Sequence, residues 1–351
     1  MTETGRLRVA VATPLSEELC DLVASREPRI DLVRDQSLMA PMRWAADFDG
    51  DPDFRRTPTQ QAAFESLVDS AEVLYGIPDV SPAALNRTVR ANQRLRWVQI
   101  MAAGGGGQVK AAGLTPEQLA SVVFTTTAGV HAGPLAEFAI FGLMAGAKHL
   151  PRLIAQRGAK EWSGRWAMGQ LSEQTVLVVG LGHIGREVAR KLSALGARVI
   201  GVSRAQITVP GAEYVVGPEH LADVAALVDA VVVTLPGTEA TYQIVDQKVL
   251  AQFRSGTTLV SVGRGTVIDE AALVSALLDG RVGFAAFDVF AVEPLPADSP
   301  LWTHPNVVVS PHTAANNAAE ERLIAELFVD NARRFLDGES LRNVVDTVEF
   351  F

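Results

Sequence analysis

The sequence has almost no cysteine and no apolar run long enough for a membrane. Cys20 is the only cysteine in 351 residues, which excludes an internal disulfide framework and favours a reducing compartment. The most apolar segment, PLAEFAIFGLMAGAKHL, contains Glu137 and Lys148 and is shorter than the roughly 20 apolar residues of a membrane-spanning helix. The N-terminal residues lack the apolar core of a signal peptide. We therefore expect a soluble, cytoplasmic protein.

Positive charge is also scarce. Lysine and arginine number 31 against 40 acidic residues, which gives a formal net charge of −9. Nucleic-acid-binding proteins usually carry a basic face, and this sequence contains none, so we expect no nucleic-acid partner. The histidines have no ligand-like spacing, and we expect no metal site. A composition with 48% hydrophobic and 20% charged residues is typical of a folded protein.

The pattern of the chain predicts strands that alternate with helices. In the N-terminal part, strands are expected at 7–13, 30–35, 72–77 and 95–100, with helices at 16–25 and 59–70. A second series of strands is expected at 175–180, 197–203, 230–236, 257–263, 283–290 and 306–312, with helices at 184–195, 221–228, 247–253, 270–280 and 319–338. Such alternation predicts an α/β fold with parallel, doubly wound sheets. The length exceeds the size at which one core stops growing, so we expect two domains.

A glycine fingerprint follows the strand that begins the second series. Gly180, Gly182 and Gly185 fit G-x-G-x-x-G, in which the glycines allow a tight turn, the approach of a pyrophosphate and close packing of helix on strand. The amides of His183 and Ile184 at the helix start would face the phosphates. A tight structural turn without a ligand is the alternative. The strand before the fingerprint and the helix after it favour a dinucleotide site.

The end of the next strand bears on which dinucleotide binds. NAD sites usually have an acidic side chain here that binds the ribose hydroxyls, whereas this chain has Ser203 and Arg204. Serine and arginine can bind the additional phosphate of NADP, which a carboxylate would repel. We therefore favour NADP(H) over NAD(H). The alternative is that Arg204 is only a surface residue and that the cofactor is NAD.

Three polar residues follow apolar strands of the second series and suit the reduction of a 2-oxo acid. Arg264 can hold a carboxylate with its planar fork, and His312 belongs to the residue type that exchanges protons near neutral pH. Glu293 can fix the tautomer of a histidine beside it. Each of them has an ordinary structural alternative. Their positions at the carboxyl ends of parallel strands, where ligands bind in such sheets, favour a shared active site.

Asp288 lies inside an apolar strand, in FAAFDVF. A carboxylate in such a place is costly unless a partner compensates it. The carboxamide of a bound nicotinamide could be that partner.

These segments together resemble the D-isomer-specific 2-hydroxyacid dehydrogenase family. The resemblance rests on VLVVGLGHIG, on SVGRGTVIDEAALVSALLDGRVGFAAFDVFAVEPLP and on SPLWTHPNVVVSPHTA, and it extends from about residue 95 to 315. It implies that Arg264 anchors the substrate, that His312 is the acid/base and that Glu293 supports it. Asp288 would orient the nicotinamide. Further residues that would line the cofactor are Pro236, Thr241, Val262, Gly263 and Ala314.

The resemblance also implies how the domains are organised. Residues 1–104 with 313–351 would form a discontinuous, flavodoxin-like substrate domain, and residues 105–312 a Rossmann cofactor domain. The backbone amides of Ala103, Gly104 and Gly105, in AAGGGGQ, would bind the substrate carboxylate. Family members usually have a bulkier residue and an acid after the first glycine, so the four glycines here would make this entrance roomier or more mobile. The alternative is that the segment is a plain flexible linker.

The activity implied by the resemblance is reversible reduction of a 2-oxo acid to the D-2-hydroxy acid. The Ser-Arg pair and SPLW are more like glyoxylate/hydroxypyruvate reductases, and Glu293 argues against a formate dehydrogenase. The resemblance further implies a homodimer joined through the cofactor domains. One alternative is a non-catalytic dinucleotide sensor, because some relatives are corepressors. Another is an oxidoreductase for a substrate without a carboxylate, which would leave Arg264 without a role.

Overall fold

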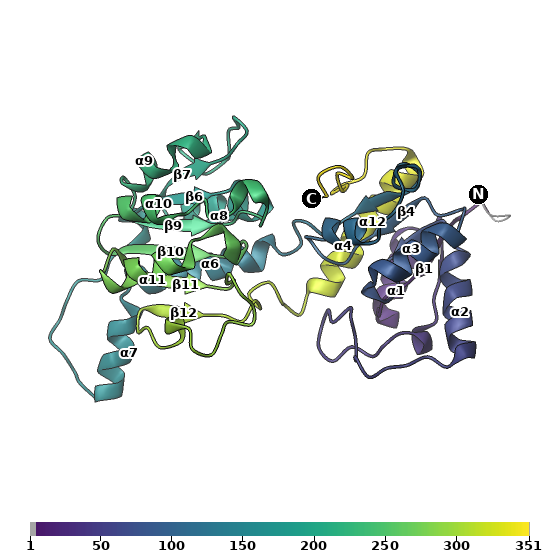
Figure 1. Cartoon of the computed structure of the whole chain (residues 1–351), viewed down its shortest axis with the longest axis horizontal. Helices are drawn as coiled ribbons and strands as arrows, with labels where there is room; N and C mark the ends of the chain where they lie inside the picture. Colours follow the sequence, from purple (N-terminus) through teal and green to yellow (C-terminus); the bar gives the residue numbers. More distant parts are fainter. Residues whose placement is uncertain (1–4, 351) are drawn as a thin grey trace. The chain divides into compact units, whose positions relative to one another are not determined.

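The computed structural model describes residues 5–350. Residues 1–4 and 351 lie outside the described part. Both ends belong to the expected substrate domain, and residues 1–4 also belong to the N-terminal segment in which we expect no signal peptide. The chain divides into two compact units (Figure 1). Unit 1 comprises the residues up to His131 together with those from Asn316 onward, and unit 2 is Ala132–Ala315. No helix in the described range is both long and apolar enough to cross a membrane.

Unit 1 contains a parallel five-stranded sheet in the order β2-β1-β3-β4-β5. Its strands are β1 (Leu7–Val11), β2 (Ile30–Val33), β3 (Val73–Tyr75), β4 (Trp97–Gln99) and β5 (Val123–Thr125). Its helices are α1 (Glu17–Arg26), α2 (Pro58–Asp69), α3 (Pro82–Ala91), α4 (Gly106–Ala111), α5 (Pro116–Ser121) and α12 (Glu320–Asp337). Short 3-10 turns occur at Gln36–Leu38 and Pro78–Val80.

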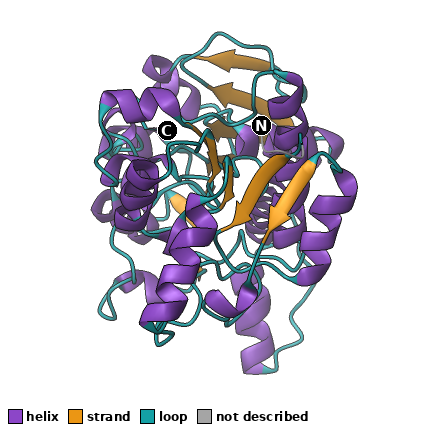
Figure 2. Cartoon of the chain, turned by 90° about the vertical axis from the view of Figure 1, so that its right-hand side faces the viewer, coloured by secondary structure: helices purple, strands orange, loops and turns teal. Residues whose placement is uncertain are grey.

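The alternation of side chains along these strands buries both faces of the sheet. Val9 and Val11 pack with helices α1 and α12, whereas Ala10 and Leu74 pack with α2, α3 and α4. Trp97 of β4 is fully buried and stacks on Phe328 of α12 with ring centroids 4.9 Å apart. The C-terminal segment therefore completes a core that the N-terminal segment begins. Figure 2 shows helices on either side of the strands.

Unit 2 contains a parallel seven-stranded sheet in the order β12-β11-β10-β9-β6-β7-β8. Its strands are β6 (Thr175–Val179), β7 (Arg198–Val202), β8 (Tyr214–Val216), β9 (Ala230–Val233), β10 (Thr257–Ser261), β11 (Val282–Phe287) and β12 (Val307–Val309). Its helices are α6 (Ala132–Ala147), α7 (Leu150–Ala159), α8 (His183–Ala194), α9 (Leu221–Ala225), α10 (Gln247–Gln252) and α11 (Glu270–Leu278). Short 3-10 turns occur at Leu171–Glu173, Pro218–His220, Glu239–Thr241, Gly265–Val267 and Pro300–Trp302.

Helices cover both faces of this sheet. Val176 and Val178 face α6 and α8, whereas Leu177 and Val179 face α9, α10 and α11. The strands are apolar on both sides because both sides are buried. The α/β fold with two parallel sheets is thus confirmed.

The boundary between the units differs from the expected one. The first crossing lies between His131 and Ala132 rather than after residue 104, because β5 pairs with β4 and extends the sheet of unit 1. The second crossing lies after Ala315 rather than after residue 312, because the amides of Thr313 and Ala314 bond to Asp288 in unit 2. The pairing of a short strand and hydrogen bonds between distant residues leave no pattern in the sequence, so the sequence could not predict these two boundaries.

Candidate active site

The carboxyl ends of β10, β11 and β12 carry four of the residues that the sequence indicates. Arg264 follows β10 and precedes a 3-10 turn at Gly265–Val267, Asp288 follows β11 directly, and His312 follows β12. Glu293 lies in the loop after β11. Parallel pairing of β10 with β11 and of β11 with β12 places these strand ends along one edge of the sheet. Ligands bind at this edge in open α/β sheets.

His312 and Glu293 form a hydrogen-bonded pair. The distance between His312 Nδ1 and Glu293 Oε2 is 2.7 Å, and the two side chains are 44% and 35% exposed. The other carboxylate oxygen, Oε1, accepts a hydrogen bond of 2.9 Å from the backbone amide of Phe290. His312 has a positive φ of 54°, which is unusual for a residue other than glycine and marks local strain at this position.

The environment of Glu293 keeps it ionised. Desolvation raises the pKa of Glu293, but the hydrogen bonds from His312 and from the Phe290 amide, with the charges of His312 and Arg264, outweigh it and lower the pKa below its ordinary value. An ionised Glu293 accepts a hydrogen bond from Nδ1–H of His312, so this pairing leaves Nε2 as the nitrogen that can exchange a proton with a ligand.

The guanidinium of Arg264 is exposed and available. Its Nη1 donates to the carbonyl of the neighbouring Gly263 at 2.8 Å, and no carboxylate of the described chain forms an ion pair with it. An exposed arginine with open donors suits the binding of a carboxylate from outside the chain.

Asp288 is buried, with 1% of its surface exposed, and one of its oxygens has no partner. The other oxygen, Oδ1, accepts hydrogen bonds from the Ser310 hydroxyl at 2.5 Å and from the amides of Thr313 and Ala314 at 2.9 Å each. These three donors explain how the strand end tolerates a carboxylate. The unpartnered Oδ2 can accept from a donor on a ligand such as a carboxamide.

Sequence reasoning identified Asp288 but missed Ser310. Phe287 lies opposite Val309 in the register of β11 and β12, so the following residues of each strand, including Asp288 and Ser310, lie close together. A serine that follows an apolar strand beside a strand that ends in aspartate is the signal that could have identified it.

The glycine fingerprint has the geometry of a phosphate site. Gly180 has a φ of 101°, and a side chain at Gly185 would collide with the carbonyl of Gly180, so both positions require glycine. A Cβ at Gly182 would meet no atom within 4 Å, which leaves open space at the turn. Helix α8 begins at His183 without a side-chain cap. Its first amides are therefore available to an anion.

The other residues that we expect to line the cofactor differ in exposure and in hydrogen bonding. Ser203 follows β7 and accepts a hydrogen bond from the amide of Ala205, and the exposed Arg204 makes no ion pair with another described residue. Thr241 donates its hydroxyl to the carbonyl of Pro236 at 2.6 Å and so shapes that loop. Val262 and Gly263 are buried, and the Ala314 amide is bonded to Asp288.

The expected substrate loop belongs to unit 1. Ala103, Gly104 and Gly105 form a turn before α4, and their amides donate no hydrogen bond within the described residues. Ala103 and Gly104 are exposed. Consecutive amides without acceptors can bind an anion.

An apolar pocket of about 410 Å³ lies beside the histidine–glutamate pair. Its lining includes Phe290, Leu295, Trp302 and Val309 in addition to Glu293 and His312. None of the described residues that line this pocket is a lysine or an arginine.

Known proteins resemble this chain in sequence and in structure. Residues 140–314 match the family model described as D-isomer specific 2-hydroxyacid dehydrogenase, NAD binding domain. D-3-phosphoglycerate dehydrogenase of Mycobacterium bovis is 32% identical over 87% of this chain, which spans about half (54%) of that protein. Glyoxylate/hydroxypyruvate reductase B of Yersinia enterocolitica is 32% identical over 58% of this chain and 64% of its own length.

A solved structure extends the likeness to the whole chain. The D-isomer specific 2-hydroxyacid dehydrogenase of Xanthobacter autotrophicus Py2, determined in complex with NADPH and MES, is 27% identical with a TM-score of 0.76. The alignment covers 99% of each chain. Together with the fold and the site, these matches show that the chain belongs to the D-isomer-specific 2-hydroxyacid dehydrogenase family.

Proposed function

We propose that the protein catalyses the reversible, NADP(H)-dependent reduction of a 2-oxo acid to a D-2-hydroxy acid. The observation that carries the proposal is the 2.7 Å pair of His312 and Glu293 on the same sheet edge as the open guanidinium of Arg264. This combination provides a proton donor and a carboxylate anchor. The D configuration rests on the family.

The residues present fit a nicotinamide dinucleotide. The uncapped start of α8 and the open space at Gly182 would hold the pyrophosphate, and the unpartnered Oδ2 of Asp288 would accept a hydrogen bond from the carboxamide. The bound cofactor would supply the hydride. No acidic side chain occupies positions 203–206, where Ser203 and Arg204 would meet the additional phosphate of NADP(H).

The side chains of unit 2 would perform the remaining chemistry. Arg264 would bind the substrate carboxylate and orient the carbonyl carbon. His312 in its doubly protonated form would donate the Nε2 proton to the oxygen of the reduced carbon. Glu293, ionised because its pKa is lowered, would stabilise the positive charge of that histidine before transfer. In the reverse reaction, the neutral histidine would accept the proton from the hydroxyl group.

We propose glyoxylate, hydroxypyruvate or a related small 2-oxo acid as the substrate. One relative is named glyoxylate/hydroxypyruvate reductase B, and the described residues that line the pocket beside His312 include no lysine or arginine for a phosphorylated side chain. In unit 1, the amides of Ala103, Gly104 and Gly105 would be able to bind a carboxylate.

The direct test follows the oxidation of NADPH and of NADH with glyoxylate, hydroxypyruvate, pyruvate and phenylpyruvate. We expect turnover with a preference for NADPH. The His312→Ala variant should lose turnover by about three orders of magnitude or more and keep its affinity for NADPH. A preference for NADH would refute the assignment of Ser203 and Arg204 alone. Tight NADPH binding without turnover of any acid would favour a dinucleotide sensor.

We also propose a homodimer joined through unit 2. Helix α7, labelled in Figure 1, has no buried residue. Ile154 on this helix is 49% exposed. Trp162 in the following loop is fully exposed. Exposed apolar side chains gathered in this way commonly mark an interface. Light scattering should give twice the mass of the chain, and Ile154→Glu should lower it, whereas Arg157→Glu on the same helix serves as a charge control.

A further inference from the structure

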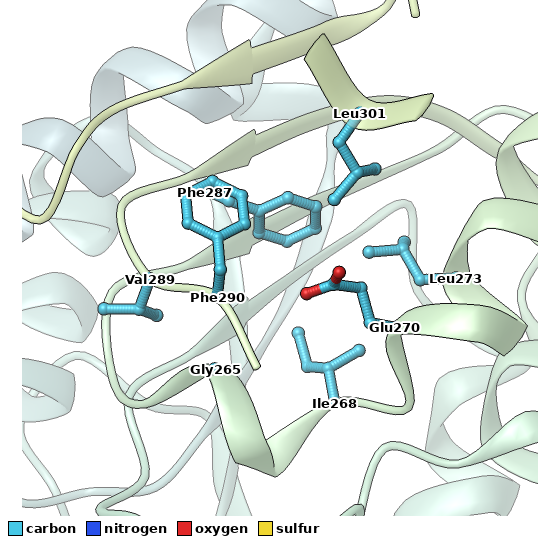
Figure 3. Close-up of a pocket in the computed structure, with 8 residues that line it drawn as sticks. All are labelled: Gly265, Ile268, Glu270, Leu273, Phe287, Val289, Phe290 and Leu301. Atoms are coloured by element: carbon cyan, nitrogen blue, oxygen red, sulfur yellow. The ribbon is translucent and has the colours of Figure 1, made fainter. Parts of the chain in front are cut away.

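Glu270 occupies a position between the two loops of the candidate active site. It is the first residue of α11, in the segment that follows Arg264 and the 3-10 turn. Its side chain is half-buried. Figure 3 shows its carboxylate in a pocket that Leu273, Phe287 and Leu301 also line. The pocket there has a volume of only about 10 Å³, so it can hold no more than one water molecule.

The carboxylate of Glu270 binds the loop that carries Glu293. Its Oε2 accepts a hydrogen bond of 3.1 Å from the backbone amide of Ala291. The preceding amide, that of Phe290, donates to Glu293 Oε1 at 2.9 Å. Two consecutive amides therefore bind two different carboxylates, one of which bonds to His312.

The loop of Arg264 also touches the loop of Glu293. A side chain at Gly265 would collide with the backbone of Phe290 and Ala291, so the two backbones are in direct contact there. Glu270 follows this contact in sequence and bonds across it. The arrangement fixes the Arg264 loop and the Glu293 loop against each other.

We infer that Glu270 is a positioning residue: by binding the Ala291 amide, it holds Glu293 where it can bond to Nδ1 of His312. The inference rests on the proposed function for its effect on turnover. A role of Glu270 limited to helix α11 is the alternative. Asp269 already caps this helix, because its side chain accepts from the Ala272 amide at 3.0 Å. The two roles can therefore be separated by mutation.

The kinetic test compares Glu270→Ala, Glu270→Gln and the control Asp269→Ala. We expect Glu270→Ala to lower kcat about tenfold to a hundredfold with little change in KM, because a small displacement of an acid/base pair is costly. Glu270→Gln should recover most of kcat, since its amide oxygen can accept from Ala291. Asp269→Ala should lower the Tm and leave kcat within about twofold. Equal losses of kcat in Glu270→Ala and Asp269→Ala would overturn the inference in favour of helix stability.

A double-mutant cycle tests whether Glu270 acts through Glu293. In a Glu293→Gln background, adding Glu270→Ala should change kcat by no more than about twofold. A further loss as large as in the wild-type background would show that Glu270 acts by another route and would overturn the inference.

A measurement without turnover separates this inference from the proposed function. The proton between His312 Nδ1 and Glu293 should give a downfield proton NMR resonance that is absent from His312→Asn. It should persist in Glu270→Gln and Asp269→Ala and shift or disappear in folded Glu270→Ala. An unchanged resonance in Glu270→Ala overturns the inference, whatever the activity. If the wild-type protein showed no turnover but its resonance still shifted or disappeared in Glu270→Ala, the proposed function would be refuted and the positioning role of Glu270 would be retained.

Discussion

The first strand of each unit leads through a short loop into a helix, and the two helix starts differ. In unit 1, β1 leads to α1, whose N-terminus is capped by Ser16 through a hydrogen bond of 3.3 Å to the Leu19 amide. The buried Leu15 fills the loop before it. In unit 2, β6 leads to α8, whose cap position is Gly182, with neither a side-chain bond nor an atom within 4 Å of a Cβ built there.

This difference separates a helix start that stabilises its own fold from one that can serve a ligand. The amides of a helix N-terminus need acceptors, and a serine side chain supplies one from the chain itself. Where glycine stands instead, an anion can take that role. The same supersecondary unit is therefore structural or functional according to one residue and the space around it.

The largest expected effect is on the open helix start. Because a Cβ at Gly182 meets nothing in the protein, Gly182→Ala should leave the unfolding free energy within about 0.5 kcal/mol. The methyl group would stand where the pyrophosphate approaches, so the Kd for NADPH should rise about tenfold to a hundredfold. Fluorescence titration with NADPH and urea unfolding measure the two quantities. An unchanged Kd would contradict the assignment of this turn to the cofactor.

The closed helix start should give the opposite pattern. Ser16→Ala removes the acceptor for the Leu19 amide and should lower the unfolding free energy by about 1 kcal/mol. Its Kd for NADPH should equal that of the wild type. Ser16→Asp, which keeps a capping acceptor, is the matched control and should retain the stability. If Ser16→Ala weakened NADPH binding as much as Gly182→Ala, the contrast between the two starts would fail.

A smaller effect concerns acids whose pKa is lowered in each unit. In unit 1, the hydrogen bond from Arg29 to the buried Glu27 outweighs desolvation and lowers the pKa of Glu27 from its ordinary value of 4.5. A lowered folded-state pKa gives stability that is present above pH 4.5 and lost as the pH falls through the folded value. Urea unfolding between about pH 6 and pH 3 should therefore show a shallower loss of stability for Glu27→Gln than for the wild type.

Glu293 in unit 2 also has a lowered pKa, but its partners are the candidate acid/base His312 and the Phe290 amide. Its ionisation serves the proposed proton transfer. Glu27 bonds to an arginine that also contacts Asp337 of α12, so its ionisation ties together the two chain segments of unit 1. A parallel slope in Glu27→Gln and wild type would contradict this assignment for Glu27.

Several elements could not be predicted from the sequence. The three-residue strands β5 and β8 are too short to show a period, and they are strands because their neighbours β4 and β7 offer free edges. Helices α3, α4, α5 and α7 were not expected either. Helix α7 has no residue buried within this chain, so burial does not impose a helical period of apolar residues on its sequence.

The sequence by itself determined the α/β class, the main alternation of strands and helices, and the residues with the chemistry for the site. These features depend on local periodicity, on glycines required by backbone geometry and on residue types. Tertiary structure decided which strands pair, where the units divide, and which oxygens remain unpartnered. The three donors to Asp288 and the bond from Ala291 to Glu270 join strands and loops distant in sequence. Such contacts exist only once the sheet has formed, because parallel pairing brings the strand ends together.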